Sequence, residues 1–250
     1  MKSKFNFSMM AAMFAILSVA TFVACDKDDD TDSGAIADNT IVAAVNNGSS
    51  YSGQIDAVKA IVDADEEYDS ETGTYVLTGY EAGSAPYVNG GFTLKLQATV
   101  ADKYLGPMFD DEDEEIPGIT ISNPNVKVNS TIILAYKADV LTGLLYYRTA
   151  DETWDGILLY ANGDISITGS TTDDDGESTY IEKYNVHLKK GWNMIYGKEV
   201  EKESGYEYEL TSTAPTGLQW YFYDSDNSKS QQATAGASLK KRLQAFGVTQ

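Results

Sequence analysis

Apolar and polar residues alternate in short runs along most of this chain, and turn residues separate the runs about every 8 to 12 positions. A period of two is typical of strands that bury one face. Helical periodicity is scarce outside the two ends of the chain. The pattern therefore predicts an all-β protein folded as an antiparallel β-sandwich. The runs lie at residues 54–62, 75–80, 92–96, 131–138, 144–149, 156–160, 164–168, 180–188, 193–196, 206–211 and 218–223.

The clearest turn signal is the Asn-Gly pair at residues 162–163. Both residue types tolerate positive φ, which the tight type I′ turn requires at its two central positions. Apolar Ile165 and Ile167 follow the pair at a spacing of two. This pattern predicts a hairpin that joins residues 156–160 to residues 164–168.

The acidic run DDEDEE at residues 110–115 interrupts the alternating pattern. Six like charges repel one another, so the run is expected to be a solvated loop. It suggests an N-terminal β subdomain at 39–116 and a C-terminal β subdomain at 117–224. The alternative is one continuous sandwich with a long acidic loop.

The last segment, residues 225–250, has a different pattern. Leu239, Leu243 and Phe246 recur at helical spacing, beside three consecutive cations. This spacing predicts a short amphipathic helix at residues 233–246 that packs on the sheet, with its cations facing an acidic body.

The charge balance narrows the classes of partner. The chain has 250 residues, 38 acidic and 18 basic side chains, and a formal net charge of −20. Such a surface disfavours nucleic acid and electrostatic binding to anionic lipid. One Cys and one His exclude an internal disulfide and a Cys/His zinc site. The content of 17 Tyr is too high for a disordered acidic chain.

The first 24 residues predict a targeting signal. Lys2 and Lys4 precede an uncharged stretch at residues 9–24. The stretch is shorter than the roughly 20 residues that a transmembrane helix needs, and small residues end it. Residues 1–24 are therefore expected to be a signal peptide that is removed. The alternative is an uncleaved membrane anchor.

The sequence FVAC at residues 22–25 resembles a bacterial lipobox, although Phe22 replaces the usual Leu or Val. The acidic DKDDD that follows resembles the export signal of surface lipoproteins of the Bacteroidota. The resemblance covers only residues 1–30. It implies that Cys25 carries lipid such as palmitate, that residues 25–38 form an acidic tether, and that the protein is anchored to the outer membrane, facing the exterior.

Aromatic residues are the candidate ligand-binding side chains. A flat aromatic surface holds the apolar side of a sugar or anchors a protein partner. Trp154 stands among acidic residues in an expected loop, whereas Trp220 begins a run of four aromatic residues. The alternative for each ring is core packing. The candidates are Trp154, Trp192, Trp220, Tyr221 and Tyr223.

One acidic segment matches part of a calcium-loop pattern. Asp173, Asp175, Gly176 and Glu182 fall at positions 3, 5, 6 and 12 of that pattern. Position 1 is Thr171 instead of Asp, and strands instead of helices are expected on both sides. The candidate Ca²⁺ ligands are Asp173, Asp175 and Glu182, and the alternative is an exposed acidic hairpin.

No catalytic constellation emerges from the sequence. The lone His187 lies in a predicted strand, and no G-x-S-x-G motif accompanies it. The sequence favours a non-catalytic surface protein that binds a glycan, a nutrient or a protein ligand and requires no cofactor. The first alternative is a structural subunit of a surface complex or fimbria. The second is a small surface hydrolase that uses paired carboxylates.

Overall fold

The computed structural model describes residues 34–69, 74–108, 116–174, 178–202 and 205–224. Strands dominate these residues, so the predicted all-β class is confirmed. Three short 3₁₀ helices accompany them: η1 (Ala37–Asn39), η2 (Gly48–Tyr51) and η3 (Asp102–Tyr104). The predicted lipidated Cys25, the tether up to residue 33 and the predicted helix at 233–246 lie outside the described residues.

The described chain forms fourteen strands in two sheets. The strands are β1 (Thr40–Ala44), β2 (Ala57–Asp69), β3 (Thr74–Pro86), β4 (Gly91–Lys95), β5 (Gly106–Pro107), β6 (Ile119–Ile121), β7 (Lys127–Lys137), β8 (Val140–Thr149), β9 (Asp155–Ala161), β10 (Ile165–Asp174), β11 (Thr179–Leu188), β12 (Gly191–Lys202), β13 (Gly205–Thr211) and β14 (Leu218–Asp224).

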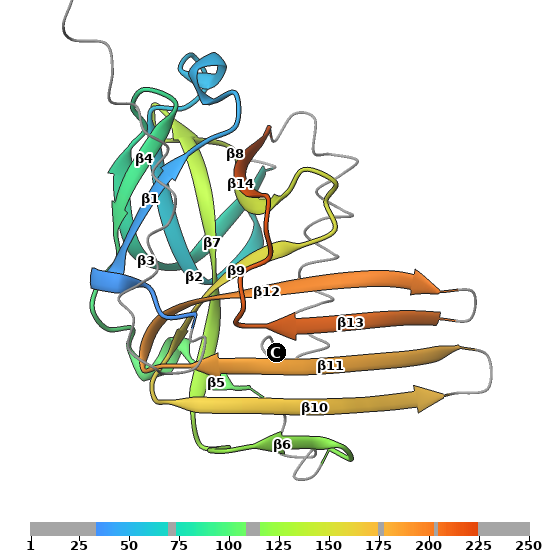
Figure 1. Cartoon of the computed structure of the whole chain (residues 1–250). Coiled ribbons are helices and arrows are strands. Elements are labelled where there is room, and N and C mark those ends of the chain that lie inside the picture. Colours follow the sequence, from blue (N-terminus) through green and yellow to red (C-terminus); the bar gives the residue numbers. More distant parts are fainter. Residues whose placement is uncertain (1–33, 70–73, 109–115, 175–177, 203–204, 225–250) are drawn as a thin grey trace, which may run out of the picture.

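The larger sheet runs in the order β3-β2-β7-β8-β9-β12-β13-β11-β10-β6, with β14 paired to β8 and β5 paired to β7 (Figure 1). The smaller sheet is the antiparallel pair β1–β4. Pairing is antiparallel except between β11 and β13, which run in parallel. The β2–β7 pairing joins strands from the two sides of the predicted boundary at residues 116–117.

The predicted hairpin at residues 162–163 is wrong in its pairing. Strand β9 pairs with β12, β7 and β8, whereas β10 pairs with β11 and β6. The turn bonds to the start of β7 instead: Asn162 N donates to Lys127 O at 3.0 Å, and Lys127 N donates to Asn162 Oδ1 at 2.9 Å. The Asn-Gly pair therefore makes a corner at which the chain leaves one set of strands and enters another.

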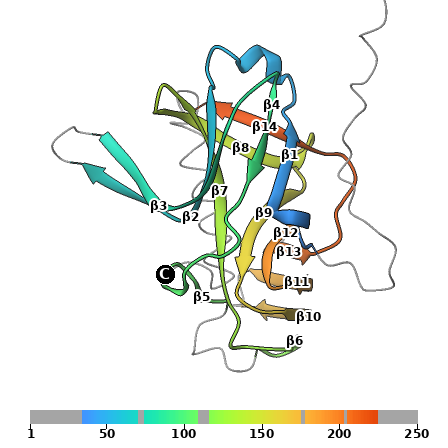
Figure 2. The same cartoon turned by 90° about the vertical axis from the view of Figure 1, so that its left-hand side faces the viewer.

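Two hydrophobic clusters lie on opposite sides of β9 and β12. In Figure 2, β1 and β4 lie above β12, whereas β11 and β10 lie below it. The first includes Leu158 and Tyr160 of β9 and lies beneath the β1–β4 pair. The second includes Ile157 and Leu159 and extends to β10, β11 and β13. Because side chains alternate along a strand, β9 contributes to both clusters at once. This double burial makes β9 and β12 the centre of the molecule.

Strands β12, β13, β11 and β10 continue side by side beyond the two clusters, as Figure 1 shows. We call this extension the blade, defined by residues 169–174, 179–183, 198–202 and 205–209. Most of its side chains are half-buried or exposed on both faces. The blade thus offers two surfaces of one thin sheet to solvent.

Candidate functional site

Ion pairs link the strands on one face of the blade. Lys183 Nζ lies 2.8 Å from Glu207 Oε1, and Lys198 Nζ lies 2.6 Å from Glu209 Oε2. Lys202 Nζ lies 3.5 Å from the second oxygen of Glu207. We call this surface the ion-paired face. Each of its three lysines lies near a carboxylate on the neighbouring strand, and Lys183 and Lys202 share Glu207.

The opposite surface, which we call the tyrosine face, carries three tyrosines and four carboxylates. The strand register places them in two rows that cross the blade from β12 to β10. The outer row is Glu201, Tyr206, Tyr180 and Asp173. The inner row is Glu199, Tyr208, Glu182 and Thr171.

The rings of the tyrosine face lie close together. The Tyr180 and Tyr206 rings stack with their centroids 6.1 Å apart and an interplanar angle of 22°. The Tyr206 and Tyr208 rings lie 6.4 Å apart along β13. All three rings are half-buried, so each packs on a neighbour and still offers surface to solvent. The face is therefore an aromatic strip bordered by acidic groups.

The two faces differ because charges in the blade follow a period of two. In β12 the lysines Lys198 and Lys202 alternate with Glu199 and Glu201. Alternate side chains of a strand point to opposite faces, so every lysine of these strands falls on the ion-paired side. Among the described blade residues, the tyrosine face receives no Lys or Arg.

Glu182 is the most constrained carboxylate of the tyrosine face. Burial raises its pKa above the ordinary value, and the charge of Asp173 adds to this effect. The Tyr184 hydroxyl donates to Glu182 Oε2 at 2.9 Å, which acts in the opposite direction. Burial and the charge of Asp173 therefore make Glu182 easier to protonate than an exposed glutamate.

The predicted calcium loop takes a different shape in this structure. Residues 171–174 pair with residues 179–182 as antiparallel strands, so Thr171 faces Glu182 across a ladder instead of beginning a loop. Asp173 and Glu182 share the tyrosine face, whereas Asp175 and Gly176 lie outside the described residues. Among the described residues, no three His, Cys, Asp or Glu side chains are grouped as a metal site would require.

A second cluster on the same side of the sheet surrounds Arg148 of β8. Its guanidinium donates to both oxygens of Asp155, at 2.8 and 3.2 Å, and to the Tyr223 hydroxyl at 2.9 Å. Glu152 Oε2 lies 3.2 Å from Nη1. Burial disfavours the charge, but Asp155 outweighs it, and the pKa of Arg148 is raised.

The Arg148 guanidinium also lies over two aromatic rings, 5.4 Å from the Tyr146 centroid and 5.5 Å from the Tyr223 centroid. The two rings meet edge to face at 5.1 Å. Burial raises the pKa of Tyr146 to about 12, although the nearby Arg148 acts against this rise. Two tyrosines and two carboxylates thus enclose one arginine.

Two of the predicted tryptophans lie in the core. Trp192 is 2% exposed, and its Nε1 donates to Gln97 O at 2.7 Å. Trp220 is 4% exposed and stacks on Tyr147 with centroids 5.1 Å apart. Neither ring offers a surface to an external ligand. Their bulk and apolar surface place them where the most area can be buried.

The other predicted aromatic residues lie nearer the surface. Trp154 is half-buried against the first cluster, with Lys198 Nζ 4.7 Å from its ring centroid. Tyr221 and Tyr223 are half-buried on the outward side of β14. Only Tyr223 joins a polar cluster, that of Arg148. Ligand binding by these residues stays a prediction.

Sequence reasoning missed Tyr206 and Tyr208 as site residues. The signal was present in the alternating Tyr-Glu-Tyr-Glu of residues 206–209. That pattern predicts a strand with one tyrosine face, but it does not say that Tyr180 lies beside Tyr206. The parallel pairing of β11 with β13 brings the rings together, and it follows from the fold alone.

His187 has two polar side chains as neighbours. Its ring nitrogens lie 3.0 Å from Ser166 Oγ and 3.2 Å from Asn185 Oδ1. The side chain is half-buried on the less buried side of β11, as its strand position predicts. Both contacts are ordinary polar neighbours along and across the strands.

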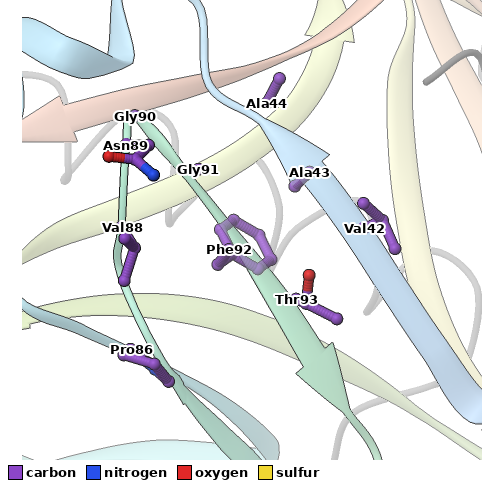
Figure 3. A pocket seen from close by; sticks show the side chains of 10 residues that line it. All are labelled: Val42, Ala43, Ala44, Pro86, Val88, Asn89, Gly90, Gly91, Phe92 and Thr93. Atoms are coloured by element: carbon purple, nitrogen blue, oxygen red, sulfur yellow. The ribbon is translucent and has the colours of Figure 1, made fainter. Parts of the chain in front are cut away.

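A shallow hollow of about 340 Å³ lies between the β1–β4 pair and the chain that leads from β3 to β4 (Figure 3). Val42 and Val88 in its wall are 51% and 55% exposed. Its ten lining residues carry no ionisable side chain. The hollow therefore offers apolar contact without groups for acid–base chemistry.

No protein-family model matches the sequence, and no curated protein or solved structure matches the chain. Within the described ranges, no helix is long and apolar enough to cross a membrane. Function must therefore be argued from the site itself.

Proposed function

We propose that this protein is a lipid-anchored, non-catalytic binding protein of the bacterial cell surface and that its ligand lies on the tyrosine face. The observation that carries the proposal is the aromatic strip of Tyr180, Tyr206 and Tyr208, bordered by carboxylates on the blade. The ion-paired face has the same strands and the same backbone, but it carries no tyrosine among its described residues.

Tyrosine suits such a surface because its ring is large and rigid and ends in a polar group. Ordering a tyrosine on binding costs little rotamer entropy for the area that it buries. Stacked rings 6.1 Å apart can contact one extended ligand together. The flanking carboxylates would accept hydrogen bonds from the ligand and fix its orientation.

The proposed location rests on the first thirty residues. FVAC and the acidic stretch behind it resemble the signals of surface lipoproteins, and Cys25 is the only thiol of the chain. Palmitate labelling of cells that produce the protein tests this part, with Cys25→Ala as the control. Label that persists in Cys25→Ala would contradict it.

The binding face is tested by thermal unfolding of the protein with panels of soluble glycans and peptides. A ligand at 100 times its dissociation constant adds about 2.7 kcal/mol to the free energy of unfolding. We expect Tyr206→Leu to abolish the shift, because it removes the stacked ring and keeps an apolar side chain. Ile181→Ala, on the same blade but on the ion-paired face, is the matched control and should keep the shift.

A ligand that shifts the wild type and Tyr206→Leu equally would place binding elsewhere. A panel without any shift would favour the assembly-subunit alternative, in which the partner is a protein of the surface complex. Release of product from a glycan by the wild-type protein would favour the hydrolase alternative.

A further inference from the structure

We propose that residues 225–250 cover an apolar patch on the large sheet and that Leu239, Leu243 and Phe246 make the contact. The inference does not depend on the proposed ligand. It follows from a group of apolar side chains that neither hydrophobic cluster includes, from the place where β14 ends, and from the sequence of residues 225–250.

The patch lies on the side of β2, β7 and β8 that faces away from the first cluster. Ile133 and Leu145 pair across β7 and β8 and belong to the first cluster. Because side chains alternate along a strand, their neighbours point to the other side. The register joins these neighbours into one group across the three strands. The group, which we call the apolar patch, consists of Ile61, Ile132, Leu134 and Leu144.

The apolar patch is buried without being part of either cluster. Leu134 is 0% exposed and Ile61 is 8% exposed, whereas Ile132 and Leu144 are half-buried. None of the four belongs to the two clusters of described residues or packs against them. An apolar sheet face is stable in water only when another element packs on it. The patch therefore requires a cover that the two clusters do not supply.

Strand β14 brings the chain to the edge of the apolar patch. Its Tyr223 pairs with Leu144 of the patch, and the strand ends one residue later at Asp224. Residues 225–232 can span up to about 26 Å. The three strands of the patch are together only about 10 Å wide. The helix predicted at residues 233–246 can therefore reach any part of the patch.

The sequence of this segment fits the cover that the patch requires. Leu239, Leu243 and Phe246 recur at helical spacing and form one apolar stripe, which must pack on another apolar surface. Residues 225–250 contain four Lys or Arg and one Asp, whereas the whole chain has a net charge of −20. The remainder of the chain is thus acidic and attracts the segment. Its tether beside the patch also gives it a high effective concentration over a separate partner.

The first test measures whether residues 225–250 shield the patch in the full chain. Cys25→Ala removes the only thiol, and Leu144→Cys then places a half-buried thiol on the patch. We expect Leu243→Asp/Phe246→Asp to raise the rate of maleimide labelling of this thiol at least tenfold. Val42→Cys is the matched control, because Val42 is 51% exposed on β1 and should label equally in both backgrounds.

A rate at Leu144→Cys that the two substitutions leave unchanged would overturn the inference. If that rate is slow and rises on dilution, a second copy of the chain covers the patch instead. If it is as fast as the rate at Val42→Cys, nothing covers the patch. Circular dichroism spectra that match the wild type establish that each variant folds.

A double-mutant cycle keeps the inference testable if the charged variant does not fold. Leu243→Ala/Phe246→Ala is combined with Leu134→Ala on the patch and, as the control, with Val58→Ala in the first cluster. Side chains in contact are coupled, whereas distant ones act additively. We expect the effect of the pair on the unfolding equilibrium constant to be at least threefold smaller in Leu134→Ala than in the wild type, and unchanged in Val58→Ala. Additivity in both cycles, or equal coupling in both, would overturn the inference.

Discussion

At the scale of single residues, the fold makes the ionised form of Glu182 less favourable than it is in the unfolded chain. Its pKa is raised by burial and by Asp173, so the ionised form is more costly in the folded than in the unfolded state. The contribution of Glu182 to the free energy of unfolding is fully present below the pKa of the unfolded state. It is lost as pH rises through the pKa of the folded state. We therefore expect Glu182→Gln to raise the free energy of unfolding at pH 7, by less than about 1 kcal/mol because solvent screens this half-buried group.

Urea unfolding at pH 7 and pH 3.5 checks this expectation, because the gain should vanish when the wild-type carboxyl is already protonated. Glu207→Gln is the control. Lys183 lowers the pKa of Glu207. The contribution of Glu207 to the free energy of unfolding is therefore present above its unfolded pKa and is lost as pH falls through its folded pKa. Glu207→Gln should therefore lose stability at pH 7. A destabilised Glu182→Gln would contradict the reasoning.

At the scale of elements, one buried amide holds the turn between β11 and β12. Asn193 is fully buried, and its Nδ2 donates to Lys189 O and to Gly191 O, both at 2.8 Å. Its Oδ1 accepts from Lys189 N at 3.0 Å. The side chain thus satisfies three backbone groups that the turn would otherwise leave without partners.

We expect Asn193→Ala to lower the free energy of unfolding by about 2 to 4 kcal/mol, because buried polar groups would lose their hydrogen bonds. Chemical denaturation monitored by tryptophan fluorescence measures the change. Asn185→Ala, at an exposed position of β11, should change stability by less than about 0.5 kcal/mol. Similar losses in the two variants would argue against the role of Asn193 in this turn.

The elements also show what sequence can predict here. Alternation is a local property, so most strands of the large sheet coincide with the predicted runs, β13 and β14 among them. Partners are not local. The Asn-Gly pair at residues 162–163 favoured a hairpin, but its bonds to Lys127 made a corner instead.

The candidate site failed to emerge from sequence for a similar reason. Large aromatic rings are equally suited to a hydrophobic core and to a ligand-binding surface. In this fold, Trp192 and Trp220 are buried in the core. The tyrosine face instead depends on the parallel register that sets Tyr180 beside Tyr206. No pattern within either strand contains that register.

At the scale of the whole molecule, the two hydrophobic clusters are expected to unfold together. Strands β9 and β12 bury one face in each cluster, so neither cluster can open without exposing the other side of the same strands. Val186 is fully buried in the second cluster, whereas Trp192 and Trp220 belong to the first. The tryptophans therefore report on a cluster that Val186 does not join.

Val186→Ala should shift the single transition seen by tryptophan fluorescence and cost about 1 to 3 kcal/mol. Circular dichroism of the same samples should give the same midpoint. Two separate transitions, or a fluorescence midpoint that the substitution leaves unchanged, would instead support independent N-terminal and C-terminal subdomains.

The chain enters the described fold at the start of β12. Met194 N donates to Gly34 O at 2.7 Å, and Ile36 N donates to Trp192 O at 2.9 Å. From Met194, the strand runs about 26 Å to its far end at Lys202. If Cys25 is anchored, as proposed, the chain from Cys25 to Gly34 can span at most about 30 Å. Under that proposal, the longest reach of residues 25–34 and the length of β12 together would limit the distance of the tyrosine face from the membrane to about 60 Å.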